Sequence, residues 1–189
     1  MSIFKKRSTA IAVFVVTVVL FTLIGSHLSL DRACRKAEKA FFDKSQLQAE
    51  GYYTCPGDQL AYCTDYANRL LSVIGTDGEW AETYEALRSA RRELIGALET
   101  RDISAIGKAD QDLAEAVLAV ETMVQDGAAL PESNDDYASI ISDFNSAQAL
   151  LENSAYADHI LTFREDVLGV FPANILQRLT FVKAPETFP

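Results

Sequence analysis

Cysteine and histidine are scarce in this sequence, which has three Cys and two His among 189 residues. A disulfide-stapled scaffold needs more Cys. A di-iron helical bundle needs paired Glu-x-x-His motifs, and neither His27 nor His159 has a Glu three residues earlier. The sequence also lacks His-Glu-x-x-His, Cys-x-x-Cys, Gly-x-Ser-x-Gly and P-loop patterns. We therefore expect no enzymatic activity, no metal and no other cofactor.

Basic residues are also few, and they are unevenly placed. The chain has 17 Lys and Arg against 27 Asp and Glu, which gives a formal charge of −10. Lys5, Lys6 and Arg7 precede the first acidic residue, so residues 31–189 carry −13. Phosphate binding needs clustered Lys and Arg, and this acidic body is therefore not expected to bind nucleic acid.

An uncharged apolar segment separates the basic tip from the acidic body. Residues 8–30 contain no charged side chain, and about 20 apolar residues in a helix cross a hydrocarbon core of roughly 30 Å. We predict a basic tip over residues 1–8 and an uncleaved transmembrane helix over residues 9–29. The alternative is a cleaved signal peptide that releases a secreted bundle, but Ile24-Gly25-Ser26-His27 matches a cleavage site poorly.

The charges around this segment bear on its orientation. The compact basic tip favours a cytoplasmic N-terminus and an extracytoplasmic body at the bacterial cell membrane. Further cations follow the segment, so the opposite orientation stays open: Arg32, Arg35, Lys36, Lys39 and Lys44.

Apolar residues recur at helical spacing through the body, over residues 28–50, 60–100, 102–126 and 133–167. Gly75–Gly78 interrupts the second stretch, Asp102 can cap the third helix, and Ser133 or Asn134 can cap the fourth. A helix with one apolar stripe must bury it against a neighbour. The expected fold is all-α: an N-terminal transmembrane helix, then an antiparallel up-and-down four-helix bundle within a domain of residues 30–189.

Two pairs of side chains allow more than one interpretation. Cys55 and Cys63 would form a disulfide if the loop at Cys55 folds back, whereas a continuous helix would hold them about 12 Å apart, which is too far. Asp110 and Asp112 would attract a cation if they converge, but a solvated helix face is the favoured explanation.

The C-terminal segment from Phe171 onward is unusually apolar for a tail. We expect it to fold onto the end of the bundle, with a docking or membrane-surface segment as the alternative. Its motif resembles the ending of the LemA family of bacterial membrane proteins. The positions that carry this resemblance are Phe171, Pro172, Asn174, Ile175, Leu176, Phe181, Lys183 and Phe188.

The resemblance extends upstream, since Ala40-Phe41 precedes Pro56 at the spacing that separates an Ala-Trp pair from a Pro in the family. The family's Asp-Leu-Ile-Pro-Asn stretch is replaced here by Tyr53–Gly57, as in a divergent member. The resemblance implies a single-pass protein with an antiparallel helical bundle, no established enzymatic activity and a general link to membrane assembly and membrane proteases. We therefore expect a non-enzymatic interaction or scaffold protein with a membrane or envelope protein as partner. The alternative is a bundle that senses a small molecule, although no motif indicates a ligand.

Overall fold

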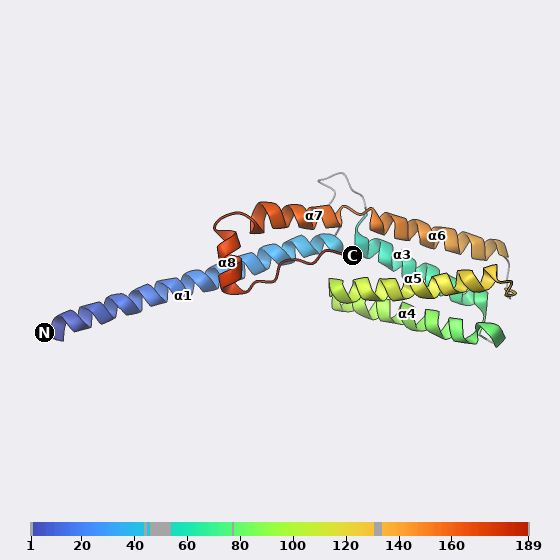
Figure 1. Ribbon diagram of the computed structural model, residues 1–189, viewed down its shortest axis with the longest axis horizontal. Coiled ribbons are helices and arrows are strands. Elements are labelled where there is room, and N and C mark those ends of the chain that lie inside the picture. The colour runs from blue at the N-terminus through green and yellow to red at the C-terminus, as the bar shows by residue number, and fades with distance from the viewer. Residues whose placement is uncertain (1, 44, 46–53, 77, 131–133, 189) are drawn as a thin grey trace. The chain divides into compact units, whose positions relative to one another are not determined.

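The computed structural model describes residues 2–43, 45, 54–76, 78–130 and 134–188, and it is all-α in these ranges (Figure 1). The chain divides into two compact units. Unit 1 combines residues 1–39 with 158–185, and unit 2 combines residues 40–157 with 186–189. The all-α prediction is confirmed, and the body predicted as one domain over residues 30–189 is divided between the two units.

Unit 1 is built on helix α1, Ser2–Glu38, which is 37 residues long. At 1.5 Å per residue it measures about 55 Å. Its side chains from Ile11 to Ile24 are largely exposed, and the helix is long and apolar enough to cross a membrane, a test that a signal sequence also passes. The helix predicted over residues 9–29 is therefore confirmed, and it continues nine residues further.

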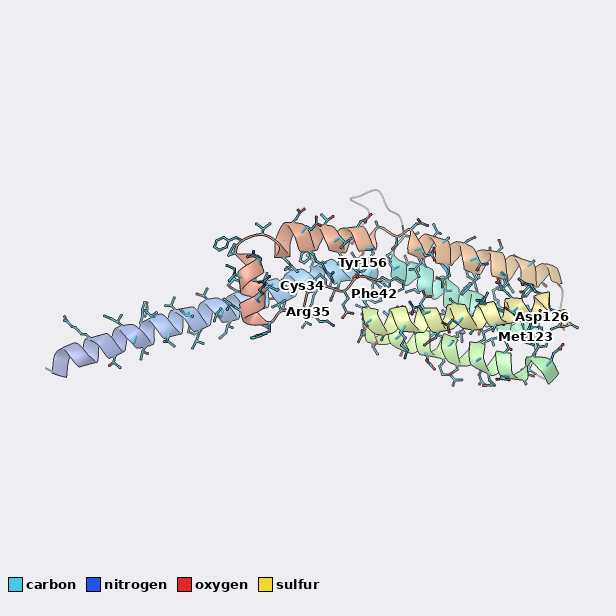
Figure 2. The ribbon with its side chains drawn as sticks, in the orientation of Figure 1. Cys34, Arg35, Phe42, Met123, Asp126 and Tyr156 are labelled. Carbon is cyan, nitrogen blue, oxygen red and sulfur yellow. The ribbon has the colours of Figure 1, made fainter. Side chains whose placement is uncertain are left out.

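The C-terminal part of unit 1 packs on α1 around the end of the apolar segment. It comprises most of α7 (Tyr156–Phe163), the π-helical turn η3 (Arg164–Leu168) and α8 (Ala173–Thr180). A small apolar core joins Leu30 and Cys34 of α1 to Leu168 and Val182; Cys34 is labelled in Figure 2. The expectation that the tail folds onto the bundle end is therefore wrong for residues up to Pro185, which belong with α1.

Unit 2 is an antiparallel bundle in its described part (Figure 1). Helix α4 packs against α5, and α3 packs against both α4 and α6. The helices are α3 (Pro56–Ile74), α4 (Ala81–Thr100), α5 (Ile103–Gln125) and α6 (Asn134–Glu152), with short 3-10 turns η1 (Lys39–Phe41) and η2 (Gly78–Trp80). The up-and-down four-helix prediction is thus correct for these described helices.

Two helix assignments behind that prediction are wrong. The stretch over residues 60–100 is two antiparallel helices, because Gly75 and Gly78 adopt φ of 73° and 68° and reverse the chain. The stretch over residues 28–50 is not the first bundle helix, because its residues up to Glu38 continue α1. Residues 46–50 of that stretch lie outside the described residues.

The predicted fourth helix is also wrong as a single element. Helix α6 ends at Glu152, and α7 begins at Tyr156. The Asn153 side chain donates to the Ala149 carbonyl at 2.7 Å, and such local bonds by Asn and Ser compete with a continuing helix. Apolar spacing runs through this break unchanged, which is why periodicity alone missed it.

The termini of the bundle helices explain why they begin where they do. Asp102 caps α5 by accepting from the Ala105 amide at 3.1 Å, as predicted. Asn134 opens α6, whereas Ser133 lies outside the described residues. The core is filled by fully buried side chains such as Leu60, Leu87 and Leu113, each stabilising the fold by about 1.5–3 kcal/mol.

Candidate functional site

The segment Phe171–Leu176, which we call the Phe-Pro motif, forms an open cleft with α1. The cleft has a volume of about 410 Å³. Its α1 wall includes the small residues Gly25, Ser26 and Ser29, and its other wall is formed by Pro172, Ala173 and Leu176. Small side chains on α1 let the short α8 approach closely. The cleft is lined mainly by apolar surface, which suits an apolar group better than a charged one.

Backbone and side-chain contacts fix α8 in place beside α1. Pro172 is the N-cap residue of α8, one position before the first helical residue. Phe181 ends α8 in the left-handed region with φ of 56°. The Nδ1 atom of His27 lies 3.1 Å from the Thr180 carbonyl oxygen, so the tautomer protonated at Nδ1 donates across to the end of α8.

The tail that follows α8 is held along unit 1 by Arg164. Its Nε donates to the Pro185 carbonyl at 3.0 Å, and its Nη2 donates to the same oxygen. Hydrogen bonds from a charged donor are worth about 1.5–3 kcal/mol each. Arg164 therefore anchors residues 181–185 against the segment that leads into α8.

One polar atom of the motif is buried without a partner. Asn174 Oδ1 accepts no hydrogen bond from any group in the part of the chain that the structure describes. A buried acceptor left unmatched costs about 1–3 kcal/mol. The amide thus sits in a place where packing alone would favour an apolar side chain.

The predicted motif residues do not form one cluster. Pro172 and Leu176 line the cleft, whereas Phe171, Ile175 and Phe181 are exposed. Phe188 belongs to unit 2.

In unit 2, Phe188 packs with the ring of Phe41, which in turn packs with Tyr156; neither ring belongs to the motif. Its ring centroid lies 5.3 Å from that of Phe41, and the Phe41 ring lies 5.1 Å from Tyr156, edge to face. Tyr156, labelled in Figure 2, donates its hydroxyl to the Glu186 carbonyl at 2.9 Å. The last residues of the chain therefore close onto the bundle. Sequence reasoning missed this role for Tyr156, whose only signal was its place in an apolar stripe.

The cysteines are free thiols, and the disulfide between Cys55 and Cys63 is not formed. Cys55 is the N-cap of α3 and Cys63 lies within that helix, which is the continuous arrangement that keeps the two sulfurs apart. Both are buried. Burial, with a smaller contribution from the nearby Asp110 charge, raises the pKa of Cys63 to about 12. Such a thiol is a poor nucleophile at neutral pH.

The expectation that Asp110 lies on a solvated helix face is wrong. It is buried, with 7% of its surface exposed, instead of lying on a solvated face. Its Oδ1 accepts from Gln148 Nε2 of α6 at 2.9 Å. Desolvation by burial raises the Asp110 pKa, and the Gln148 hydrogen bond opposes that shift. Its spacing from Ile106 and Leu113 on the apolar stripe was the signal that could have found it.

These features place polar groups in the bundle core and an apolar cleft in unit 1. Among the described residues, no three His, Cys, Asp or Glu side chains gather closely enough to hold a metal ion. Comparisons of the chain with protein-family models, with curated proteins and with solved structures found no match. The resemblance to the LemA family therefore stays a prediction.

Proposed function

We propose that the protein is a single-pass membrane protein, of the LemA type in a divergent form, that holds an acidic helical bundle at the bacterial membrane for interaction with other membrane or envelope proteins. It acts as a scaffold and not as an enzyme. The observation that carries the proposal is α1, a 37-residue helix with exposed apolar side chains between Ile11 and Leu28. Exposed apolar surface of this extent needs a lipid or protein partner.

The distribution of charge between the units supports the same proposal. Unit 1 has ten Lys and Arg against five Asp and Glu, a net charge of +5. Unit 2 has seven against 22, a net charge of −15. Anionic lipid surfaces attract basic segments beside a membrane helix and repel acidic ones. The charges thus suit a basic membrane unit and an acidic bundle that faces water.

The anchor is tested by fractionating cells that express the full chain with a C-terminal tag. We expect a product of full mass that stays in the membrane pellet after an alkaline carbonate wash. Replacing Val15 and Val16 with Arg should reduce insertion, since each Arg near the centre of a span costs about 2.5–3.5 kcal/mol. The matched control is Leu118→Arg, which places the same charge at an exposed position of α5. A shortened, soluble product would instead support the secreted bundle.

The interaction role is tested with photocrosslinking residues at exposed apolar positions of the bundle. Tyr62, Leu118 and Leu150 are 52%, 59% and 54% exposed and lie on three different helices. We expect at least one position to yield an adduct with a single membrane or envelope protein, and the buried Val120 to yield none. The absence of adducts from all three exposed positions at native expression would contradict the scaffold role.

A labelling experiment that determines on which side of the membrane the bundle lies requires an introduced thiol, because Cys34, Cys55 and Cys63 are all buried. Ala119→Cys provides an exposed one on α5. If the bundle is extracytoplasmic, as we propose, an impermeant maleimide labels this variant in intact cells. Labelling only after lysis would place the bundle in the cytoplasm.

A further inference from the structure

The short helix α8 leaves an apolar stripe uncovered on the side away from its contact with α1. Phe171, Ile175 and Leu179 follow one another at four-residue spacing and are 74%, 49% and 58% exposed. Phe181, just after the helix, is 91% exposed. We call these four residues the α8 stripe. Ala173 and Leu176, on the other face of the same helix, pack toward α1.

The contact with α1 fixes the level of the α8 stripe along the apolar segment. The cleft between the two helices is lined on α1 by residues from Phe21 to Leu30, and His27 meets the last residue of α8. Asp31 is the first charged residue after the apolar segment. The last two turns before Asp31 rise about 11 Å. The α8 stripe therefore lies where a membrane-crossing α1 leaves the hydrocarbon core.

The direction of α8 and its surroundings favour lipid as the occupant of this face. Helix α8 crosses α1 instead of running alongside it (Figure 1). A helix set across a membrane span lies along the bilayer surface with one face toward the acyl chains. At the same level, the apolar side chains Phe21, Ile24 and Leu28 of α1 are also exposed.

Charged residues at the same level complete the pattern of an interfacial helix. Arg178 of α8 is exposed, and so are Arg32 and Lys36, which follow the apolar segment on α1. Long basic side chains reach lipid phosphates while their stems rest on apolar surface. A flat apolar patch for a protein partner would not require cations at this level.

We infer that α8 is an interfacial helix whose stripe inserts at the boundary between headgroups and acyl chains of the same bilayer that α1 crosses. The inference rests on the proposed function, since it requires α1 to span the membrane. It gives the Phe-Pro motif a role in fixing the height and tilt of the membrane unit. The motif is thus a lipid-binding element.

The test uses nitroxide labels on the full chain reconstituted in vesicles of phosphatidylethanolamine and phosphatidylglycerol. Labels are placed at Leu179→Cys and, separately, Phe181→Cys, because these side chains are 58% and 91% exposed. Val16→Cys reports whether α1 lies in lipid, and Leu118→Cys is the matched exposed leucine on the bundle. The unsubstituted protein, treated identically, measures labelling of the buried native thiols. Collision rates with oxygen and with a water-soluble nickel chelate report lipid and water exposure.

We expect the ratio of oxygen to nickel collisions at residues 179 and 181 to lie between the high value at residue 16 and the low value at residue 118. A ratio equal to that at residue 118, with residue 16 in lipid, would overturn the inference and leave the anchor intact. Low collision rates with both reagents would mean that protein covers the stripe, which also overturns it. A water-like ratio at residue 16 would overturn the proposed anchor itself.

Discussion

The buried carboxyl of Asp110 gives the sharpest test of the bundle's energetics. Only 7% of the residue is exposed, and its carboxylate has the Gln148 amide as a hydrogen-bond donor at 2.9 Å. Desolvation by burial dominates and raises the pKa of Asp110 in the folded state above the usual value of an aspartate. Asp110→Asn keeps the shape and the acceptor oxygen but removes the charge. We expect this variant to be more stable than the parent at pH 7.

The sign and size of the effect follow from proton linkage. Between the unfolded-state and folded-state pKa values, the native protein holds more protons at Asp110 than the unfolded chain does. The contribution of Asp110 to stability is therefore fully present below about pH 4 and is lost as pH rises through the folded-state pKa. Within that window the free energy of unfolding falls by at most about 1.4 kcal/mol per pH unit. In Asp110→Asn this component of the pH dependence disappears.

The assay is urea unfolding of the full chain in detergent micelles between pH 4 and 8. Trp80 is the single tryptophan and lies in the bundle, where its Nε1 donates to the Ala129 carbonyl at 2.9 Å. Its fluorescence therefore reports unit 2. Asp65→Asn is the control, because Asp65 is exposed on α3 and its loss changes the bundle's net charge equally. The reasoning is refuted if the two variants show the same pH profile, or if Asp110→Asn is the less stable one at pH 7.

Three further outcomes follow from other contacts. Tyr156→Phe keeps the packed ring and removes the hydroxyl that donates to the Glu186 carbonyl. The free energy of unfolding should fall by about 0.5–1.5 kcal/mol in the same urea assay, and an unchanged midpoint would mean that this hydrogen bond does not hold the tail. Gly169→Ala places a Cβ 2.6 Å from the Glu165 carbonyl oxygen, and this overpacking should lower stability by about 1–3 kcal/mol. We expect faster proteolysis of the C-terminal segment in this variant. Gly96→Ala is the control, because the space around its Cβ is open, and it should show no such change. The Cys63 thiol, with its pKa raised to about 12 by burial, should resist a thiol reagent at pH 8 until urea is added, and rapid labelling of the native protein would contradict its burial.

Local patterns in the sequence predicted the elements better than their pairing. The uncharged run of residues 8–30 predicted the first helix, and Asp102 predicted the start of α5, because both signals depend only on neighbouring residues. The association of Leu30 and Cys34 with Val182 spans about 150 residues. Helical spacing shows which face is apolar and not which partner covers it, so it does not reveal that the residues up to Glu38 belong with α1 and not with the bundle.

The candidate site was predicted in part for the same reason. The motif at Phe171–Leu176 marked the right segment, but the exposed face of α8 depends on its contact with α1. The charge of Asp110 favours a solvated face, whereas its position on the apolar stripe between Ile106 and Leu113 favours the core. A carboxyl at a core position signals an internal hydrogen bond, here from Gln148.

The order in which the two units appear along the chain has a consequence for biosynthesis. Helix α1 leaves the ribosome first, but the residues that cover Leu30 and Cys34 come from the last part of the chain. The 118 residues of Ala40–Ala157 separate them, which takes about 6–24 s to translate at roughly 5–20 residues per second. During that delay helices α3 to α6 can pack together, although residues 158–185 of unit 1 and the final residues that close onto the bundle are not yet made. A chain released after α6 would thus carry packed bundle helices on an α1 whose residues Leu30 and Cys34 are uncovered. Quality-control proteases could distinguish this form by its exposed apolar surface.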